Sequence, residues 1–447
     1  MSNTVTSAFI DLATFDEIEK YLYNGPTAIT FFVRCVRKAT WFAQVPVPLT
    51  QNAGNPQFNG DVAFQISRAG DYLLHTWLRF CLPAVSAEGG DVRWCRNIGH
   101  NLIDLCWISF NDLKVQEFDS YWLDMWSQFT IPASKQNGYN NMIGNVAELT
   151  TEGLAELPEY TVNVPLPFFF TRDTGVALPT AALPYNEMRI HFEFRSLDEL
   201  LIGEYDGSPQ LKNVQLWANY AVVSNEERVK MGKCPRDMVI EQVQRHGGRS
   251  FNAAQIGTSS NTPYDIRFSH SIKALFWNVA NTTREDPSRP AREWSNYTTG
   301  SLAGPPEQAP DDLIVEGGYP GGADPVAATS LLYENTFRLF EMGSDYFSLV
   351  QPWYHFTSIP EETGYHVYSF ALNPEAMDPS GTTNFGKLTN VSLQLTPSAA
   401  AFEANTKPED RLDSTNPLPQ QTFQVFIRAL NFNIVRVSGG ALGLPVL

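Results

Sequence analysis

The sequence predicts an all-β protein made of two similar sandwich or jelly-roll domains. Residues 165–194 contain an aromatic strand, a turn-rich stretch and an alternating strand, and residues 367–395 repeat this layout at an offset of about 200 residues. Short runs of β-branched and aromatic residues, broken by Gly, Pro, Asn and Asp, fill most of the chain. A repeat of this length is too long for a solenoid and fits duplicated domains.

Two further pairs of segments keep nearly the same offset. ISRAGDYLLHTWLRF, starting at Ile66, aligns loosely with IRFSHSIKALFWNV, starting at Ile266, and residues 216–223 align with residues 426–437. Few identities repeat, so the similarity lies in the order of patterns. A chain of 447 residues exceeds the size at which one core keeps growing, which favours two domains.

The first predicted element is a short helix at residues 15–23. Thr14 and Glu17 have the spacing of a capping box, and Asn24 with Gly25 supplies a stop. Its apolar positions need a partner surface. That surface is either the helix's own domain, or a neighbouring molecule or inner layer on which an arm docks.

From Ile29 onward the dominant pattern predicts strands. The candidates of ordinary strand length are AITFFV (28–33), VAFQIS (62–67), YLLHTWLRF (72–80), LIDLCWISF (102–110) and EMRIHFEF (187–194). Many short strands with irregular connections are typical of sandwiches and jelly rolls. Residues 119–131, DSYWLDMWSQFTI, break this rhythm and predict a helix inserted between strands.

Charged and turn-rich stretches predict the domain organisation. The densest charged stretch, residues 224–238, falls where the first set of strands ends, so we place the domain boundary there as a linker. Residues 281–330 and 396–421 are rich in Pro, Gly, Ala, Asp and Asn and predict long loops. Long loops at one end of a sandwich would build an exposed surface.

The composition limits the classes of partner. Hydrophobic residues make up 43% of the chain and charged residues only 18%, against about 25% in an average globular protein, which suits surface buried against copies of itself. The net charge of −17 and the absence of a basic run argue against direct binding of nucleic acid.

The cysteines and the N-terminal sequence indicate the compartment. The five cysteines are widely spaced and mostly lie among apolar neighbours, which favours a reducing environment. The first 20 residues lack the pattern of a signal peptide, and no apolar run is long enough to span a bilayer. We expect a soluble protein made in the cytosol.

Motifs for nucleotide, metal or nucleophilic chemistry are weak. GTTNFGK at 381–387 fits the start of a phosphate-binding loop, but Leu388 stands where Ser or Thr must bind magnesium. The seven histidines never approach one another or a cysteine at ligand spacing, and there is no CxxC, HExxH or GxSxG motif. The sequence therefore supports neither a zinc site nor a catalytic triad.

Three carboxylates leave one alternative function open, and three glycosylation motifs do not add another. Asp71, Glu187 and Glu193 lie near aromatic strands, so a carbohydrate-binding or carbohydrate-cleaving β-sandwich is the alternative function. Asn281, Asn296 and Asn390 begin N-x-Ser/Thr sequons, which we interpret as chance matches because no export signal precedes them.

Motifs throughout the chain resemble the major capsid protein family of iridoviruses. They are FIDLATFDEIEKYLYNG, RAGDYLLHTWLRF, FNDL, SKQNGYNNMIGN, PLPFFFTRDTGVALPTAALPYNE, RFSH, LLYENT, PSGTTNFGKLTN and the closing GALGLPVL. The resemblance runs from about residue 8 to the end. It implies a double jelly roll, with two eight-stranded antiparallel barrels or sandwiches in tandem and short helices.

The resemblance also implies domain limits. They are an N-terminal arm with a short helix at 1–25, a first jelly roll at 26–224, a charged linker at 225–237 and a second jelly roll at 238–447, whose loop 281–330 faces outward. The arm would lie on the inner side, near minor proteins or an internal lipid layer. The loops 281–330 and 396–421 match the family pattern least.

The function implied by the resemblance is assembly and not catalysis. Homotrimeric, pseudo-hexameric capsomers would tile the outer icosahedral shell of a large double-stranded DNA virus, with a separate penton protein at the vertices. Assembly would take place in the host cytoplasm. The resemblance implies no catalytic, cofactor-binding or metal-binding residue, and we expect Asp or Lys at Phe168, Phe169 or Phe170 to prevent folding or trimer formation.

Overall fold

The chain forms two structural units, Met1–Trp41 and Phe42–Leu447. The structure is a computed structural model that describes residues 3–151, 153–254, 262–284, 289–300, 322–406 and 420–445. Parts of the loops predicted at 281–330 and 396–421 lie outside these described residues.

The N-terminal unit contains helices α1 (Asn3–Ala13) and α2 (Glu17–Tyr23). The predicted helix at 15–23 is therefore present but begins two residues later. Asp16 caps it, since its backbone amide donates to the Glu19 carboxylate at 3.3 Å in a capping box. The Thr14 hydroxyl instead donates to the carbonyl of the preceding helix, so Thr14 is not the cap.

The strand predicted at 28–33 is wrong. Residues 28–33 form turns and irregular backbone, and no described segment pairs with them. A strand needs a neighbour for its backbone N–H and C=O groups, which the hydrophobic pattern of AITFFV does not supply. Phe31 and Phe32 are 92% and 97% exposed.

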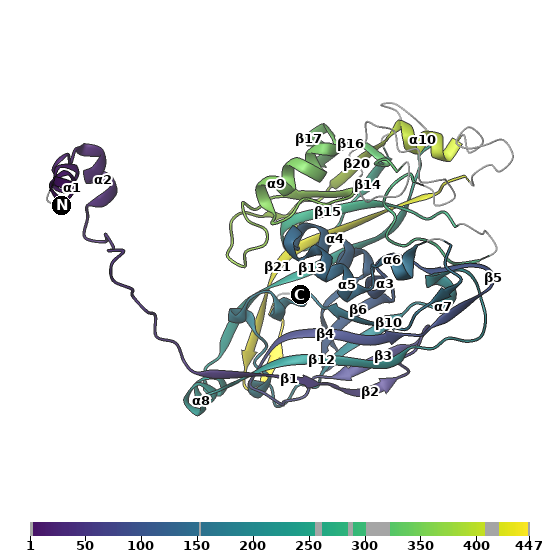
Figure 1. Cartoon of the computed structure of the whole chain (residues 1–447), viewed down its shortest axis with the longest axis horizontal. Helices are drawn as coiled ribbons and strands as arrows, with labels where there is room; N and C mark the ends of the chain where they lie inside the picture. Colours follow the sequence, from purple (N-terminus) through teal and green to yellow (C-terminus); the bar gives the residue numbers. More distant parts are fainter. Residues whose placement is uncertain are drawn as a thin grey trace. The chain divides into compact units, whose positions relative to one another are not determined.

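The first jelly roll consists of two facing antiparallel sheets and a small third sheet (Figure 1). One sheet has the order β1 (Phe42–Pro48), β12 (Lys212–Val223), β4 (Tyr72–Leu82) and β9 (Tyr160–Pro165). The facing sheet has the order β2 (Thr50–Gly54), β3 (Asp61–Gln65), β10 (Met188–Phe194), β6 (Ile103–Phe110) and β7 (Leu113–Asp119). The small sheet has the order β11 (Leu201–Tyr205), β5 (Val85–Trp94) and β8 (Glu156–Leu157).

The second jelly roll repeats this design. One sheet has the order β13 (Arg236–Phe251), β21 (Phe423–Ser438), β15 (Ser271–Asn281) and β18 (Tyr365–Ser369), with β19 (Thr383–Asn384) beside β15 and β22 (Ala441–Gly443) beside β21. The facing sheet has the order β14 (Thr262–Asp265), β20 (Val391–Pro397), β16 (Val326–Tyr333) and β17 (Thr336–Gly343). The double jelly-roll prediction is confirmed, although the sheets do not close into barrels.

The strand order confirms the internal duplication. In both jelly rolls the first strand pairs with the long strand near the end of the domain, β1 with β12 and β13 with β21. The repeat that begins at Ile66 and Ile266 supplies β4 and β15, which occupy the same place in their sheets. The repeat at 216–223 and 426–437 lies in β12 and β21, and the layout at 165–194 and 367–395 ends in β10 and β20.

Short helices connect the strands. They are α3 (Ile98–Asn101), α4 (Ser120–Thr130), α5 (Ala133–Ile143), α6 (Ala147–Thr150), α7 (Leu197–Leu200), α8 (Asn225–Lys233), α9 (Gln351–His355) and α10 (Ala399–Thr406). Single helical turns are η1 (Phe169–Thr171), η2 (Thr174–Val176), η3 (Thr180–Ala182), η5 (Tyr346–Val350) and η6 (Phe385–Lys387). The helix predicted at 119–131 is α4, and its N-cap Asp119 accepts a hydrogen bond from the Trp122 amide at 3.0 Å.

Alternation along the strands places the core between the sheets. In β10, Met188, Ile190, Phe192 and Phe194 are buried while the residues between them are partly exposed. This is the period of two expected for a strand with one face on the core. One core cluster joins such residues of the first jelly roll to Phe276 and Leu430 of the second.

Candidate functional site: the junction of the jelly rolls

Helix α4 joins the two jelly rolls. It follows β7 of the first jelly roll (Figure 1), and its aromatic side chains contact Phe276 on β15 of the second. Trp122 packs edge-on against Phe276 with ring centroids 5.1 Å apart, and Phe129 lies 5.7 Å from the same ring. Buried aromatic pairs of this kind add to the area-based hydrophobic term.

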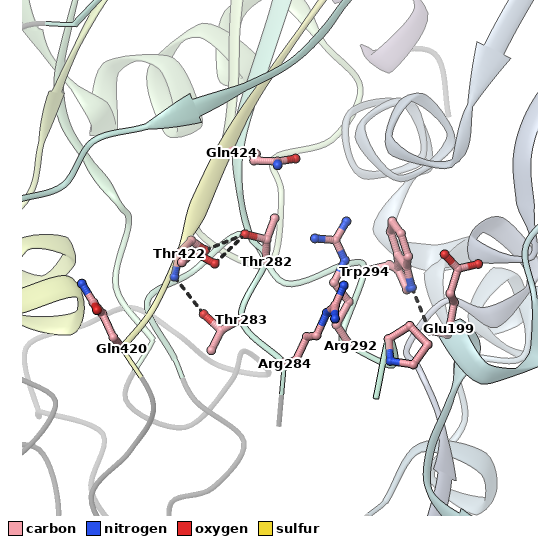
Figure 2. Close-up of a pocket in the computed structure, with 10 residues that line it drawn as sticks. Glu199, Thr282, Thr283, Arg284, Arg292, Trp294, Gln420, Thr422 and Gln424 are labelled. Carbon is pink, nitrogen blue, oxygen red and sulfur yellow. Dashed lines mark hydrogen bonds between the residues drawn. The ribbon is translucent and has the colours of Figure 1, made fainter. Parts of the chain in front are cut away.

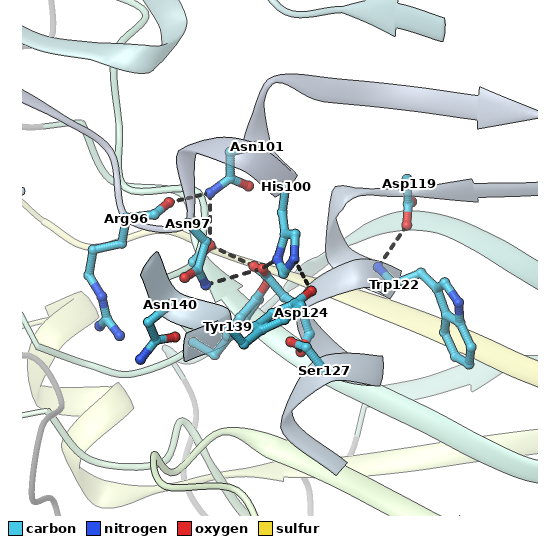
Figure 3. Close-up of polar contacts among 12 residues, drawn as sticks. Arg96, Asn97, His100, Asn101, Asp119, Trp122, Asp124, Ser127, Tyr139 and Asn140 are labelled. Carbon is cyan, nitrogen blue, oxygen red and sulfur yellow. Dashed lines mark hydrogen bonds and ion pairs between the residues drawn. The ribbon is translucent and has the colours of Figure 1, made fainter. Parts of the chain in front are cut away.

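A buried carboxylate on α4 organises the polar part of the junction. Asp124 is 1% exposed and accepts hydrogen bonds from Asn97 and His100 through one oxygen, at 3.2 and 2.5 Å (Figure 3). Its other oxygen accepts from the hydroxyls of Ser295 and Tyr297, at 2.5 and 2.9 Å. Asp124 therefore ties the 289–300 segment of the second jelly roll to helices of the first.

His100, one of the partners of Asp124, is also buried. The second ring nitrogen of His100 lies 2.6 Å from the Tyr139 hydroxyl, and both His100 and Asp124 are fully buried (Figure 3). Burial and the charge of Asp124 raise the pKa of the Tyr139 and Tyr297 hydroxyls. Both oxygens of Asp124 and both ring nitrogens of His100 thus have partners in the interior, so this Asp–His–Tyr series holds the junction together.

Buried ion pairs connect the same two jelly rolls. Arg93 pairs with Glu293, Arg96 with Glu362, and Arg428 with Asp119. Arg172 follows η1 and contacts Glu241 of β13 at 2.9 Å, and Glu241 also binds the buried Lys273. Burial lowers the pKa of Lys273. Breaking a buried pair leaves an uncompensated charge, so these contacts fix one arrangement of the two jelly rolls.

An apolar surface remains exposed on the second jelly roll. We define the α9 patch as Leu349, Val350, Trp353, Tyr354 and Leu372; Trp353 is 70% and Tyr354 73% exposed. The carbonyl of Leu372 lies 3.0 Å from the His355 ring, which brings the loop beside the helix. Grouped exposed apolar side chains mark an interaction surface more often than single ones do.

The three carboxylates considered for a carbohydrate-binding or carbohydrate-cleaving site do not form one site. Asp71 is bound to Arg228 at 2.7 Å, and Glu187 to Arg189 at 2.5 Å. Glu193 lies on β10, where burial and the charges of Asp61 and Asp104 raise its pKa. Since each carboxylate has its own surroundings, they form no shared catalytic pair.

The segment 381–387, which fits the start of a phosphate-binding loop, also lacks the strand and helix that flank such a loop. GTTNFGK contains β19 and η6, whereas a phosphate loop leads from a buried strand into a full helix. No group of three or more metal-ligating side chains occurs within the described residues. Cys81, Cys95 and Cys106 are buried free thiols, and Cys35 and Cys234 are exposed free thiols.

Two of the three sequons are enclosed. The Asn281 side-chain amide is buried and donates to the carbonyl of Thr298 at 3.2 Å. Asn296 is also buried and donates to Gly300 at 3.1 Å. A glycan on either nitrogen would need this packing to open. In the part of the chain that the structure describes, no helix is both long and apolar enough to cross a bilayer.

Comparisons of fold define the class of protein. The chain is similar to a PBCV-1 virus capsid structure, with a TM-score of 0.74 and 22% identity over 94% of this chain and 100% of that chain. It is also similar to the Faustovirus major capsid protein, with a TM-score of 0.70 and 14% identity over 95% of each chain. The fold is thus that of double jelly-roll viral capsid proteins.

Comparisons of sequence identify the family. The model described as "Major capsid protein N-terminus" matches residues 30–227, and that of the large eukaryotic DNA virus major capsid protein matches residues 227–443. Major capsid proteins of Costelytra zealandica iridescent virus and Invertebrate iridescent virus 6 are 48% and 49% identical over 100% of this chain and 99% of each relative. The chain belongs to the major capsid proteins of large eukaryotic DNA viruses. It is a structural protein of the virion capsid, and the predicted family and function are confirmed.

Proposed function

We propose that three copies of the chain form a pseudo-hexameric capsomer that tiles the outer icosahedral shell of the virus. The observation that carries this proposal is the strand order shared by the two jelly rolls. Three chains then present six similar modules around a threefold axis, which gives a near-hexagonal outline. Such an outline fills a flat lattice.

The α9 patch supplies a surface for self-association. Stable obligate interfaces are large and apolar, and aromatic residues are enriched at their centres. Trp353 and Tyr354 meet this description, since both are mostly exposed in the single chain. We assign the patch to a contact between copies of the chain, while polar surface serves the weaker contacts between capsomers.

Other partners follow from the N-terminal unit and the net charge. Phe9, Ile18 and Leu22 are exposed in α1 and α2, so this unit needs an apolar partner. We assign it to minor capsid proteins or the inner lipid layer, with a separate penton protein at the vertices and assembly in the host cytoplasm. The net charge of −17 supports indirect enclosure of the genome, without contact to nucleic acid.

The domain limits remain part of this proposal. They are an arm at 1–25, jelly rolls at 26–224 and 238–447, and a linker at 225–237. Strands β1 to β12 lie within the first jelly-roll range, 26–224. Helix α8 occupies most of the linker range, 225–237, and β13 begins within that range at Arg236. We assign the outward surface of the particle to the loop 281–330.

Light scattering on a gel-filtration column tests the capsomer. We expect a stable species of three times 50.0 kDa across a range of protein concentrations. The double variant W353D/Y354D should elute as a folded monomer, because two charges would be desolvated in the interface. Val229→Asp on α8, also at an exposed apolar position, is the matched control and should stay trimeric. A wild-type monomer at all concentrations would refute the trimer, and a trimeric W353D/Y354D would remove the α9 patch from it.

A further inference from the structure

A polar cavity lies at the junction, and none of the residues that line it belongs to the α9 patch. Its volume is about 560 Å3, within the range of small-ligand sites. It is lined by Glu199 of α7, residues that follow β15, the 290–294 segment and residues 420–424 at the start of β21 (Figure 2). Thr282, Thr283 and Thr422 stand on one side of Arg284 and Arg292, and Trp294 and Glu199 stand on the other.

The cavity concentrates positive charge in an acidic protein. Arg284 is exposed, and neither Arg284 nor Arg292 pairs with a carboxylate among the described residues. Arg292 donates one hydrogen bond to the Tyr121 hydroxyl at 3.0 Å, so most of its N–H groups remain available. Burial lowers the pKa of Arg292, and the charges of Arg195 and Arg284 lower it further. An anion between the two guanidiniums would relieve this repulsion.

The carboxylate of the lining is already engaged. Glu199 accepts hydrogen bonds from the backbone amide and hydroxyl of Ser196, at 3.0 and 2.8 Å, in the capping box of α7. Its hydrogen bonds therefore serve its own helix, and its charge only partly offsets the effect of burial and of the neighbouring arginines on the pKa of Arg292. Its backbone carbonyl accepts the Trp294 indole N–H at 2.9 Å, which fixes the ring at the cavity wall.

The remaining lining favours an anion over a neutral sugar. The guanidiniums of Arg195 and Arg292 each lie 3.8 Å from the Trp294 ring centroid, and two such contacts must use opposite faces of the ring. No ring face is left on which a sugar could stack. The Thr283 hydroxyl accepts from the Thr422 amide at 3.0 Å, which leaves its proton free to donate into the cavity.

We propose that this cavity is an oxyanion site, in which Arg284, Arg292 and the Thr283 hydroxyl bind a sulfate or phosphate group. Planar guanidiniums suit the oxygens of such groups, because two parallel N–H bonds can reach two oxygens. The cavity is larger than one oxyanion. It therefore also has room for the carrier of a sulfate or phosphate ester.

Isothermal titration calorimetry on the full-length protein tests the site. The ligands are sodium sulfate, sodium phosphate, glucose 6-sulfate, glucose 6-phosphate and glucose, all in chloride buffer of matched ionic strength. We expect saturable binding of the four anions at one site per chain, and none of glucose. Tighter binding of the esters would identify an ester as the ligand, and equal binding would identify the free ion.

Two variants separate the site from general charge effects. Arg284→Gln should weaken anion binding roughly 10-fold or more, since a hydrogen bond to a charged group is lost. Arg284 is at the surface, so this variant is expected to fold. Arg267→Gln removes another exposed arginine, outside the cavity lining, and should bind as the wild type does. Absence of saturable anion binding, equal binding of glucose, or unchanged binding by Arg284→Gln would overturn the proposal.

Discussion

Single polar side chains in the interior decide how the two jelly rolls fit together. Asp124 accepts four hydrogen bonds, and two of its donors, Ser295 and Tyr297, belong to the second jelly roll. A buried polar network is stabilising only when each member has its partners. Both oxygens of Asp124 meet this condition, so the loss of this carboxylate should cost more than the loss of a surface contact.

Replacement of Asp124 by alanine should destabilise the protein strongly. Four buried donors lose their acceptor, and we expect the free energy of unfolding to fall by roughly 3–5 kcal/mol. Urea unfolding followed by tryptophan fluorescence measures this. Asp112→Ala is the control, because Asp112 is exposed in the turn between β6 and β7 and should leave the midpoint unchanged. Equal midpoints for Asp124→Ala and the wild type would show that the network does not stabilise the junction.

The ion pair between Asp71 and Arg228 should make stability depend on pH. Hydrogen bonds from Arg228 hold the pKa of Asp71 below its ordinary value of 3.8. A lowered folded-state pKa stabilises the protein above the unfolded-state pKa, and this contribution is lost as pH falls through the folded-state value. Arg228→Gln should therefore be less stable than the wild type at neutral pH, and the difference should shrink below about pH 4.

Thermal unfolding between pH 3 and pH 7 measures this dependence. Lys230→Gln on the same helix is the control, because Lys230 is exposed and should follow the wild type at every pH. A difference between Arg228→Gln and the wild type that stays constant down to pH 3 would rule out Asp71 as its source.

At the scale of elements, the strands were predictable where one face is buried and one is exposed. β10 shows this alternation, and the expected segment 187–194 is correct to one residue. The segment 28–33 has the same kind of composition but pairs with no strand among the described residues, and pairing cannot be inferred from one segment alone. The charged stretch 224–238 contains helix α8, because its residues suit a helix as well as a linker.

The junction could not be predicted because it joins residues far apart in the chain. Asp124 is the one charged residue of α4, and this lone carboxylate was the available signal for a buried acceptor. Its donors, Asn97 and Tyr297, come from segments whose meeting depends on the completed fold. The cavity around Arg284 is likewise assembled from separate loops.

The aromatic element at 168–170 should be essential for folding of the single chain. Phe168, Phe169 and Phe170 are buried in the core, and Phe168 packs on Phe118 with ring centroids 4.9 Å apart. Phe169→Ala should cost about 3–5 kcal/mol, and Phe169→Asp should yield no folded protein. Circular dichroism and soluble yield measure both. Phe340→Asp on β17 is the control, since Phe340 is 58% exposed and its replacement should leave the chain folded. If the Phe169→Asp variant folds but does not associate with other copies of the chain, the element lies at an interface between copies and not in the core.

At the scale of the whole molecule, the two jelly rolls should unfold together. One core cluster contains side chains from both, and buried ion pairs such as Asp119–Arg428 cross between them. Contacts of this kind make the stability of each half depend on the other. A subunit that presents two jelly rolls to a flat lattice needs them in one fixed arrangement. Motion about a hinge between them would change the hexagonal outline of the capsomer.

Differential scanning calorimetry under conditions that keep the chain monomeric tests this coupling. We expect a single transition for the wild type. Arg428→Met leaves the Asp119 carboxylate buried without its partner, which should reduce the free energy of unfolding by roughly 3–5 kcal/mol while the transition stays single. Arg436→Gln is the matched control, since Arg436 pairs with Asp237 on the surface between β21 and β13, within the second jelly roll. Its transition should coincide with that of the wild type. Two separate transitions in the wild type, or a shift in only one of two transitions in Arg428→Met, would show that the jelly rolls fold independently and that the junction only holds them side by side.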